Sequence, residues 1–248
     1  MFKKFALALA VAATLPASAL TTGDLAFTAF NADEDGFAMV ALANVAANTK
    51  VYFSDNEWSG TAFNTGESFS SWTSGAAVVN AGTVIRFSKT DSATLLAATV
   101  GTLARETVAL SANWGLSQAA DTLYAYLGSS ATAPTTFLSA ISSGTFGNAA
   151  DGSLINTGLS IGAGAVQLSN SSDFAEYSGS RVGQASFAGY KALISNVDQW
   201  TDSGDGTFIN NVPDTTAFSV TAVPEPESYA LMLSGLAAIG LLVGRRRA

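Results

Sequence analysis

Oxygen-bearing side chains at alternate positions make segment 31–36 the sharpest chemical pattern in the body of the sequence. It reads Asn31-Ala32-Asp33-Glu34-Asp35-Gly36. Carboxylate and amide oxygens at this spacing, followed by a glycine that permits a sharp turn, are typical of the first half of a calcium-binding loop. An EF-hand would carry a bidentate glutamate at the twelfth position, which here is Leu42. The segment is therefore not an EF-hand, and a β-turn between two strands is the commoner structure for these residues.

A second acidic loop carries Asp198, Asp202 and Asp205, followed by Gly206. It has the same two interpretations, a turn or a cation site. The two loops could share one ion if the fold brings them together, which the sequence does not decide. We expect no cofactor, with calcium on Asn31, Asp33 and Asp35, or on the second loop, as the alternative.

Glu57 and Glu67 are the best candidates for a pair of catalytic carboxylates, which a glycosidase places on either side of the scissile bond. Solvated loop carboxylates beside core aromatics are the commoner arrangement, so we predict no catalytic residues and no enzyme activity. Tryptophans can serve as sugar-binding platforms or lie half buried at the edges of a β-sandwich. The sequence contains four: Trp58, Trp72, Trp114 and Trp200.

Composition excludes several kinds of chemistry. The chain has 248 residues with neither histidine nor cysteine, which removes Ser-His-Asp and Cys-His catalysis, disulfides and thiolate metal sites. Between residues 20 and 222 there are six basic and seventeen acidic residues, a net charge of −11, whereas the whole chain carries −8. This charge argues against nucleic acid as a partner, because binding a phosphate backbone needs a cationic surface.

The elements that would position these side chains are mostly strands. Short runs rich in Val, Ile, Phe, Tyr and Thr are separated by Gly, Asn, Asp and Ser, which predicts an all-β sandwich or barrel. The predicted strands are 24–30, 37–44, 50–54, 82–88, 121–127, 136–142 and 165–169. Several runs are apolar on both faces, as central strands covered on both sides would be. We predict one or two short helices, at 92–99 and 185–197.

The N-terminus has the pattern of a secretory signal peptide. Lys3 and Lys4 precede an apolar stretch at 5–15, and Ala17 and Ala19 supply small residues at the cleavage positions. We therefore predict a signal helix at 1–19 that is removed on export, with the mature chain beginning near Leu20.

The C-terminus has a different pattern. Pro224, Glu225 and Pro226 precede an apolar run at about 229–243, which ends before Arg245, Arg246 and Arg247. The prolines prevent a helix from extending backward. The run gives about 23 Å of helix, short for a hydrocarbon core of about 30 Å unless flanking residues contribute. We predict a single membrane helix with its arginines in the cytoplasm.

These three parts, in this order, resemble the PEP-CTERM sorting signal of Gram-negative bacteria. The resemblance covers 223–248. It implies recognition by an exosortase-type membrane enzyme, cleavage near the motif, and export to the surface or an extracellular polysaccharide matrix. The membrane would be a transient partner.

The body resembles the lamin-tail-like β-sandwich modules of bacterial surface proteins. The resemblance rests on 23–38, on Val51-Tyr52-Phe53-Ser54-Asp55-Asn56-Glu57-Trp58, on 121–128 and on the stretch around 194–200. It implies an immunoglobulin-like sandwich that serves as a binding or structural unit, and it carries no catalytic residues.

The predicted organisation is a signal peptide at 1–19, a β-sandwich domain at 20–222 and a sorting signal at 223–248. We expect a non-enzymatic structural or adhesive protein of the cell surface, extracellular matrix or biofilm. The alternative is a module that binds calcium or exopolysaccharide.

Overall fold

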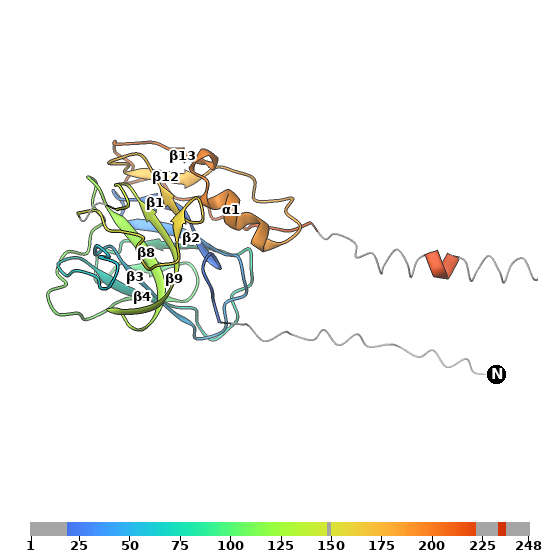
Figure 1. Cartoon of the computed structure of the whole chain (residues 1–248), viewed down its shortest axis with the longest axis horizontal. Helices are drawn as coiled ribbons and strands as arrows, with labels where there is room; N and C mark the ends of the chain where they lie inside the picture. The colour runs from blue at the N-terminus through green and yellow to red at the C-terminus, as the bar shows by residue number, and fades with distance from the viewer. Residues whose placement is uncertain (1–18, 148–149, 222–232, 237–248) are drawn as a thin grey trace, which may run out of the picture.

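The computed structural model describes residues 19–147, 150–221 and 233–236. Within these ranges the chain forms two β-sheets with a few short helical segments (Figure 1). The predicted dominance of β-structure is confirmed. Rings from both sheets meet in one core, so the sheets pack face to face, which is consistent with the predicted all-β sandwich. The finer immunoglobulin-like or lamin-tail-like topology stays a prediction.

The first sheet is antiparallel throughout and runs in the order β13-β12-β1-β2-β5-β6. Its strands are β1 (Leu25–Asn31), β2 (Gly36–Ala41), β5 (Val84–Ser88), β6 (Ala97–Ala98), β12 (Phe174–Tyr177) and β13 (Trp200–Asp202). β1 and β2 are buried along their whole length, which explains why both faces of these strands are apolar in the sequence.

The second sheet runs in the order β10-β11-β9-β8-β3-β4-β7. Its strands are β3 (Lys50–Ser54), β4 (Phe69–Thr73), β7 (Thr102–Arg105), β8 (Thr122–Ser130), β9 (Ala133–Ser142), β10 (Ser160–Ile161) and β11 (Gly164–Gln167). β11 pairs parallel with β9 and β10, and the remaining pairs are antiparallel.

Aromatic rings join the two sheets. Phe53 of β3 packs edge-to-face against Phe37 of β2 and Phe87 of β5, with ring centroids 5.0 and 5.1 Å apart. Trp72 of β4 lies across Phe87 at 6.0 Å, and its indole N–H donates to the Val100 carbonyl at 2.7 Å. The indole thus satisfies its one polar group while it fills the core.

The second sheet also has a packed outer face. Tyr52 and Tyr126 stack there at 5.8 Å, beside Trp58, Phe63 and Phe137. Successive residues of a strand face opposite sides, so β3 sends Val51 and Phe53 into the central core and Tyr52 into this outer cluster. The loops that carry Trp58, Phe63 and Leu154 cover the outer cluster, and they bring the candidate site residues with them.

The helix predictions had different outcomes. The stretch 185–197 is helical for most of its length, with η1 (Phe187–Gly189), α1 (Tyr190–Ser195) and η2 (Val197–Gln199). α1 packs beside β1 and β11 at one edge of the sandwich (Figure 1). The predicted helix at 92–99 is wrong: one i to i+4 bond joins the Leu96 N–H to Ser92, after which Ala97 and Ala98 pair with β5 as β6.

The two targeting segments lie outside the described residues, apart from Ala19 and 233–236. Leu20 is buried in the core, whereas the preceding Ala19 is exposed. Of the predicted membrane helix at 229–243 only 233–236 is described, and it is helical. In the part of the chain that the structure describes, no helix is long and apolar enough to cross a membrane.

Candidate functional site

Acidic residues gather at one end of the central strands of the second sheet. Ser54, the last residue of β3, pairs with Phe69 of β4 on one side and with Tyr124 of β8 on the other. The residues just beyond these strand ends are Asp55, Glu67 and Asp121, which we call the carboxyl cluster. Strand register therefore brings Asp121 to the end of the sheet at which Asp55 and Glu67 lie.

Asp55 is held rigidly at this end. Its Oδ1 accepts two hydrogen bonds from Ser68, from the backbone N and from Oγ, each 2.7 Å long. Its Oδ2 is buried and has no hydrogen-bond partner among the described residues. Next to it, the buried Asn56 donates to the Ser68 carbonyl at 2.8 Å and accepts from the Glu67 N–H at 3.1 Å. The base of the 55–68 loop is thus fixed by side chains rather than by strand pairing.

The carboxyl groups of Asp121 and Glu67 accept fewer hydrogen bonds than that of Asp55. Oδ2 of Asp121 accepts from the Ser117 N–H at 2.7 Å, and Asp121 is 5% exposed. No hydrogen bond in the described ranges reaches the carboxylate of the half-buried Glu67. Burial, and then the charges of Asp55 and Glu57, raise the pKa of Glu67 to about 7.

The pKa values of Asp55 and Asp121, the two buried members of the cluster, are also raised. Burial raises the pKa of Asp55 to about 7, against the lowering effect of its hydrogen bonds from Ser68. Burial, and then the charge of Asp55, raise the pKa of Asp121 well above its usual value. Burial is thus the main cause of all three shifts, and the charge of Asp55 adds to the shifts of Glu67 and Asp121.

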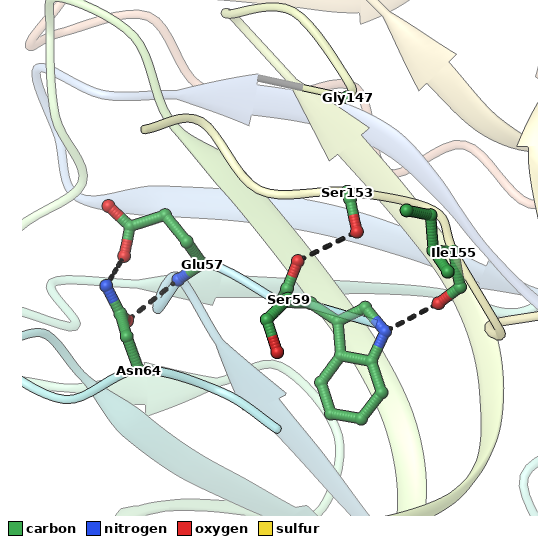
Figure 2. Close-up of a pocket in the computed structure, with 7 residues that line it drawn as sticks. Glu57, Ser59, Asn64, Gly147, Ser153 and Ile155 are labelled. Carbon is green, nitrogen blue, oxygen red and sulfur yellow. Dashed lines mark hydrogen bonds between the residues drawn. The ribbon is translucent and has the colours of Figure 1, made fainter. Parts of the chain in front are cut away.

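A pocket of about 260 Å³ is lined by Glu57, which lies two residues beyond Asp55 of the cluster. Figure 2 shows the residues that line this pocket. Glu57 and Asn64 form one wall, where the Asn64 amide donates to the Glu57 carboxylate and the Glu57 N–H donates to Asn64 Oδ1 at 3.0 Å. On the other side, Ser153 Oγ donates to the Trp58 carbonyl at 2.9 Å and the Trp58 indole donates to the Ile155 carbonyl at 2.8 Å.

The pocket continues into a more apolar hollow of about 420 Å³. The two share Gly147, Ser153 and Ile155, and the second adds Leu159 and Ile161. Ile155 and Ile161 are more than half exposed. We call the combined surface the groove, which is polar at the Glu57 end and apolar at the Ile161 end.

The predicted calcium loop at 31–36 forms a turn in which Asn31, Asp33 and Asp35 each have protein partners for their side-chain oxygens. The Asn31 amide donates to the carbonyls of Phe208 and Asn211, at 3.1 and 3.0 Å, and its Oδ1 accepts from the Glu34 N–H. Asp33 accepts from the Gln118 amide and from the Phe208 N–H. Asp35 Oδ1 accepts from the Leu116 N–H at 2.8 Å, and Asp35 adopts a φ of 55° at the turn.

The three aspartates of the second predicted loop lie in different surroundings. Asp198 is exposed in η2, and Asp202 accepts from Ser169 N and Ser172 Oγ, both at 2.6 Å. Asp205 lies by Asp173, a residue outside both predicted loops. Burial, and then the charges of Asp33 and Asp205, raise the pKa of Asp173. The two predicted loops therefore do meet, through Asp33, Asp173 and Asp205.

As the side chains stand, no three His, Cys, Asp or Glu residues in the described ranges are grouped closely enough to hold a metal ion. The calcium prediction at Asn31, Asp33 and Asp35, and its alternative at Asp198, Asp202 and Asp205, stay predictions.

Of the proposed catalytic pair, Glu57 and Glu67 are near enough for the charge of Glu57 to act on Glu67. The indole N–H groups of Trp58, Trp72 and Trp200 donate to backbone carbonyls from buried positions. Trp114 is half buried under the guanidinium of Arg105, 4.4 Å from its ring centroid. These four side chains are thus placed as parts of the fold rather than as open platforms.

Sequence reasoning missed Asp55, Asp121 and Asp173. The available signal was positional: Asp55 directly follows one predicted strand and Asp121 begins another. This signal could be used only with knowledge of which strands pair, and the sequence alone does not give the strand pairing.

The geometry defines a β-sandwich body that is complete before its C-terminal tail begins. Val220 forms a bridge with Gln184, and the Thr221 N–H donates to the Gln184 carbonyl at 2.9 Å, immediately before the tail. The family model described as the PEP-CTERM protein-sorting motif matches residues 222–247. No curated protein and no solved structure matches the chain.

This match confirms the predicted sorting motif and indicates exosortase-dependent sorting of an exported protein to the cell envelope or surface. The motif residues Pro224, Glu225, Pro226 and Arg245–Arg247 fall within the matched range but outside the described structure. Of the predicted signal cleavage residues, Ala17 also lies outside the described structure and Ala19 is its first residue.

Proposed function

We propose that the protein is a non-enzymatic structural or adhesive component of the cell surface or extracellular matrix of a Gram-negative bacterium. The observation that carries the proposal is the position of the sorting motif, which begins at residue 222, directly after the last bridge of the sandwich. The sorted cargo is therefore the folded sandwich itself. It would pass through a membrane-held intermediate before an exosortase-type enzyme processes it.

The body has properties that suit this role. Its core is continuous between two sheets and holds without disulfides, since the chain has no cysteine. Its acidic balance favours solubility outside the cell. Most of its acidic side chains are engaged by neighbouring backbone or side-chain groups, as in a rigid module.

Localisation and adhesion test this proposal together. The native chain and a variant with Arg245, Arg246 and Arg247 replaced by alanine would be expressed in cells that contain an exosortase. We expect the native chain at the surface or in the matrix, and the variant held at an earlier stage. Deletion of the whole gene should reduce attachment or matrix cohesion. Native protein recovered in the cytosol, or unchanged attachment after deletion, would contradict the proposal.

One observation favours a second candidate, a polysaccharide-binding module. The groove combines a carboxylate held by Asn64 with the exposed apolar side chains of Ile155 and Ile161. A glycan array with the purified protein tests this. Binding that is lost in Ile161→Ser but kept in Val182→Ser, an exposed position outside the groove, would support the candidate. An array without hits would eliminate it.

The enzyme alternative has its own test. Hydrolysis of any polysaccharide by the native protein that disappears in Glu57→Gln and in Glu67→Gln would replace the non-enzymatic proposal.

A further inference from the structure

Two members of the carboxyl cluster, Asp55 and Asp121, place carboxyl groups where neither water nor a basic side chain compensates a negative charge. Asp55 is 2% exposed and Asp121 is 5% exposed. The ion pairs of the described residues are Lys50–Glu106, Arg86–Glu34, Arg181–Asp214 and Lys191–Asp24, none of which includes a member of the cluster. A buried carboxylate without a partner is costly, so either protons or a bound cation must neutralise the cluster.

One oxygen of Asp55 is left without a partner. Oδ1 accepts both hydrogen bonds from Ser68, whereas Oδ2 is buried and has no hydrogen-bond partner among the described residues. Asp121 directly precedes β8, the strand that pairs with β3 on the side opposite β4. Burial, and then the charge of Asp55, raise the pKa of Asp121, so the two carboxyl groups are close enough to interact.

Glu67 supplies a third carboxylate from a more accessible position. It is half buried, and its charge contributes to the raised pKa of Asp121. Its backbone is fixed by Asn56 and by Ser111 Oγ, which donates to the Glu67 carbonyl, while its carboxylate accepts no hydrogen bond within the described ranges. The long side chain can therefore turn about its own torsions without breaking a contact of the loop.

The geometry points to a binding site for a hard divalent cation, with Ca²⁺ as the best match, formed by Asp55, Asp121 and Glu67 at the end of β3, β4 and β8. A turn of the Glu67 side chain brings the third carboxylate onto the ion. Ca²⁺ prefers six to eight oxygen ligands at about 2.3–2.6 Å and tolerates irregular geometry, so water would fill the remaining positions. The site differs from both acidic loops that the sequence singled out.

This inference is independent of the structural role proposed above. A failure to bind an ion would leave localisation and adhesion untouched, and a protein without an adhesive role could still bind the ion.

Calorimetry and thermal unfolding of the exported protein purified from cells test the inference, after removal of bound ions with a chelator. At about pH 8, where the carboxyl groups ionise, we expect one Ca²⁺ per chain. We also expect a rise in the unfolding midpoint of about 5 °C or more with the ion at about 100 times its Kd. The titration would extend to about 10 mM, because extracellular calcium modules bind in the range of about 0.1–1 mM.

Matched variants locate the site. Asp55→Asn keeps the acceptor for Ser68 but removes the charge, and Asp121→Asn does the same for Ser117. Both variants should lose the heat of binding and the thermal response, and without ions both should unfold at a higher temperature than the native protein at pH 8. The higher unfolding temperature without ions would show that the variants lose binding without a loss of folding stability. Glu67→Gln should weaken binding by at least about tenfold, as the loss of a charged ligand predicts.

Asp33→Asn is the control, because it removes one charge from the other acidic cluster and should leave the response intact. The inference is overturned if the native protein binds neither Ca²⁺ nor Mg²⁺, or if Asp55→Asn and Asp121→Asn both respond like the native protein. A response that disappears in Asp33→Asn and persists in Asp121→Asn would also overturn it, because the ion would then lie between the two acidic loops.

Discussion

The ring of Phe53 on β3 meets the ring of Phe37 on β2 edge-to-face, with centroids 5.0 Å apart, and so joins the two sheets at the centre of the sandwich. Both rings are almost completely buried. Phe53 also contacts Phe87 of β5, so one side chain of the second sheet packs against two neighbouring strands of the first.

Replacement of Phe53 by alanine should therefore lower the free energy of unfolding by about 3–5 kcal/mol, because it removes a buried ring and leaves a cavity between two rigid sheets. Urea denaturation measures the change. Leu95→Ala is the control, since Leu95 is 65% exposed and its loss should cost less than about 0.5 kcal/mol. Equal effects of the two substitutions would show that the sheets do not pack as described.

Gly101 is the position where a side chain is least compatible with the fold. Its φ is +74°, and a Cβ atom would lie 2.6 Å from the indole nitrogen of Trp72 and against the Thr73 carbonyl. We expect Gly101→Ala to destabilise the protein by about 2 kcal/mol or more, through backbone strain and displacement of the Trp72 indole. Gly158→Ala is matched to it, because Gly158 has a φ of +75° but a Cβ atom there would meet no non-neighbouring atom within 4 Å.

Thermal unfolding of the two glycine variants separates backbone strain from steric overlap. The smaller loss of stability should belong to Gly158→Ala, which adds backbone strain alone. A larger loss in Gly158→Ala than in Gly101→Ala would contradict the contact between Gly101 and Trp72.

The pH dependence of stability has a defined direction at Asp35. Burial raises the pKa of its carboxyl group from 3.8 to about 6. Because the folded protein holds this proton more tightly than the unfolded chain, the stabilising contribution is complete below about pH 4 and is lost as the pH rises through 6. Asp35→Asn, which keeps the acceptor for Leu116 and tolerates a φ of 55°, should escape that loss.

We expect Asp35→Asn to be about 1–2 kcal/mol more stable than the native protein at pH 8 and about equally stable at pH 4, after a discount for the partial exposure of the group. Urea titrations at both pH values check this. Asp198→Asn, at an exposed position, controls for the loss of one negative charge. An equal gain in the free energy of unfolding at pH 4 would show that the stabilisation by Asp35→Asn does not depend on ionisation of Asp35.

Much of the strand content could be predicted from the sequence, because apolar runs such as 37–44 and 50–54 are bounded by turn residues. β4 was missed since its sequence, Phe-Ser-Ser-Trp-Thr, has only two large apolar residues, and tertiary packing decides its structure. The helix at 92–99 was wrong because one helical turn there precedes pairing of Ala97 and Ala98 with β5. Propensity alone does not detect such long-range pairing.

The candidate site was less predictable for the same reason. Glu57 and Glu67 were recognised because they are close in sequence, whereas Asp121 joins the carboxyl cluster only through the pairing of β3 with β8. Similarly, Asp173 comes between the two acidic loops through the pairing of β1 with β12, where Asn31 lies opposite Phe174. Local composition identified acidic loops, and strand register determined which of them meet.

Trp58 links the outer aromatic cluster to the groove, and this link can be tested directly. Its ring packs against Phe63 and Phe137, at 5.0 and 5.1 Å, while its indole N–H donates to the Ile155 carbonyl at 2.8 Å. Trp58→Phe keeps an aromatic ring in the cluster but removes that hydrogen bond. The 153–157 segment is also held by Ser153, whose Oγ donates to the Trp58 carbonyl and whose carbonyl accepts from the Tyr124 hydroxyl, and by Asn156, which donates to the Gly60 carbonyl.

We therefore expect Trp58→Phe to lower the free energy of unfolding by about 1–2 kcal/mol and to speed amide hydrogen exchange selectively at 153–157, with β1 and β2 unaffected. Hydrogen exchange with peptide-level mass spectrometry measures this local opening. Trp114→Phe is the matched control, because Trp114 is half buried and its ring stacks against the Arg105 guanidinium. If exchange at 153–157 is the same in Trp58→Phe as in the native protein, the indole does not hold the wall of the groove, and the shape of the groove is set by the aromatic cluster alone.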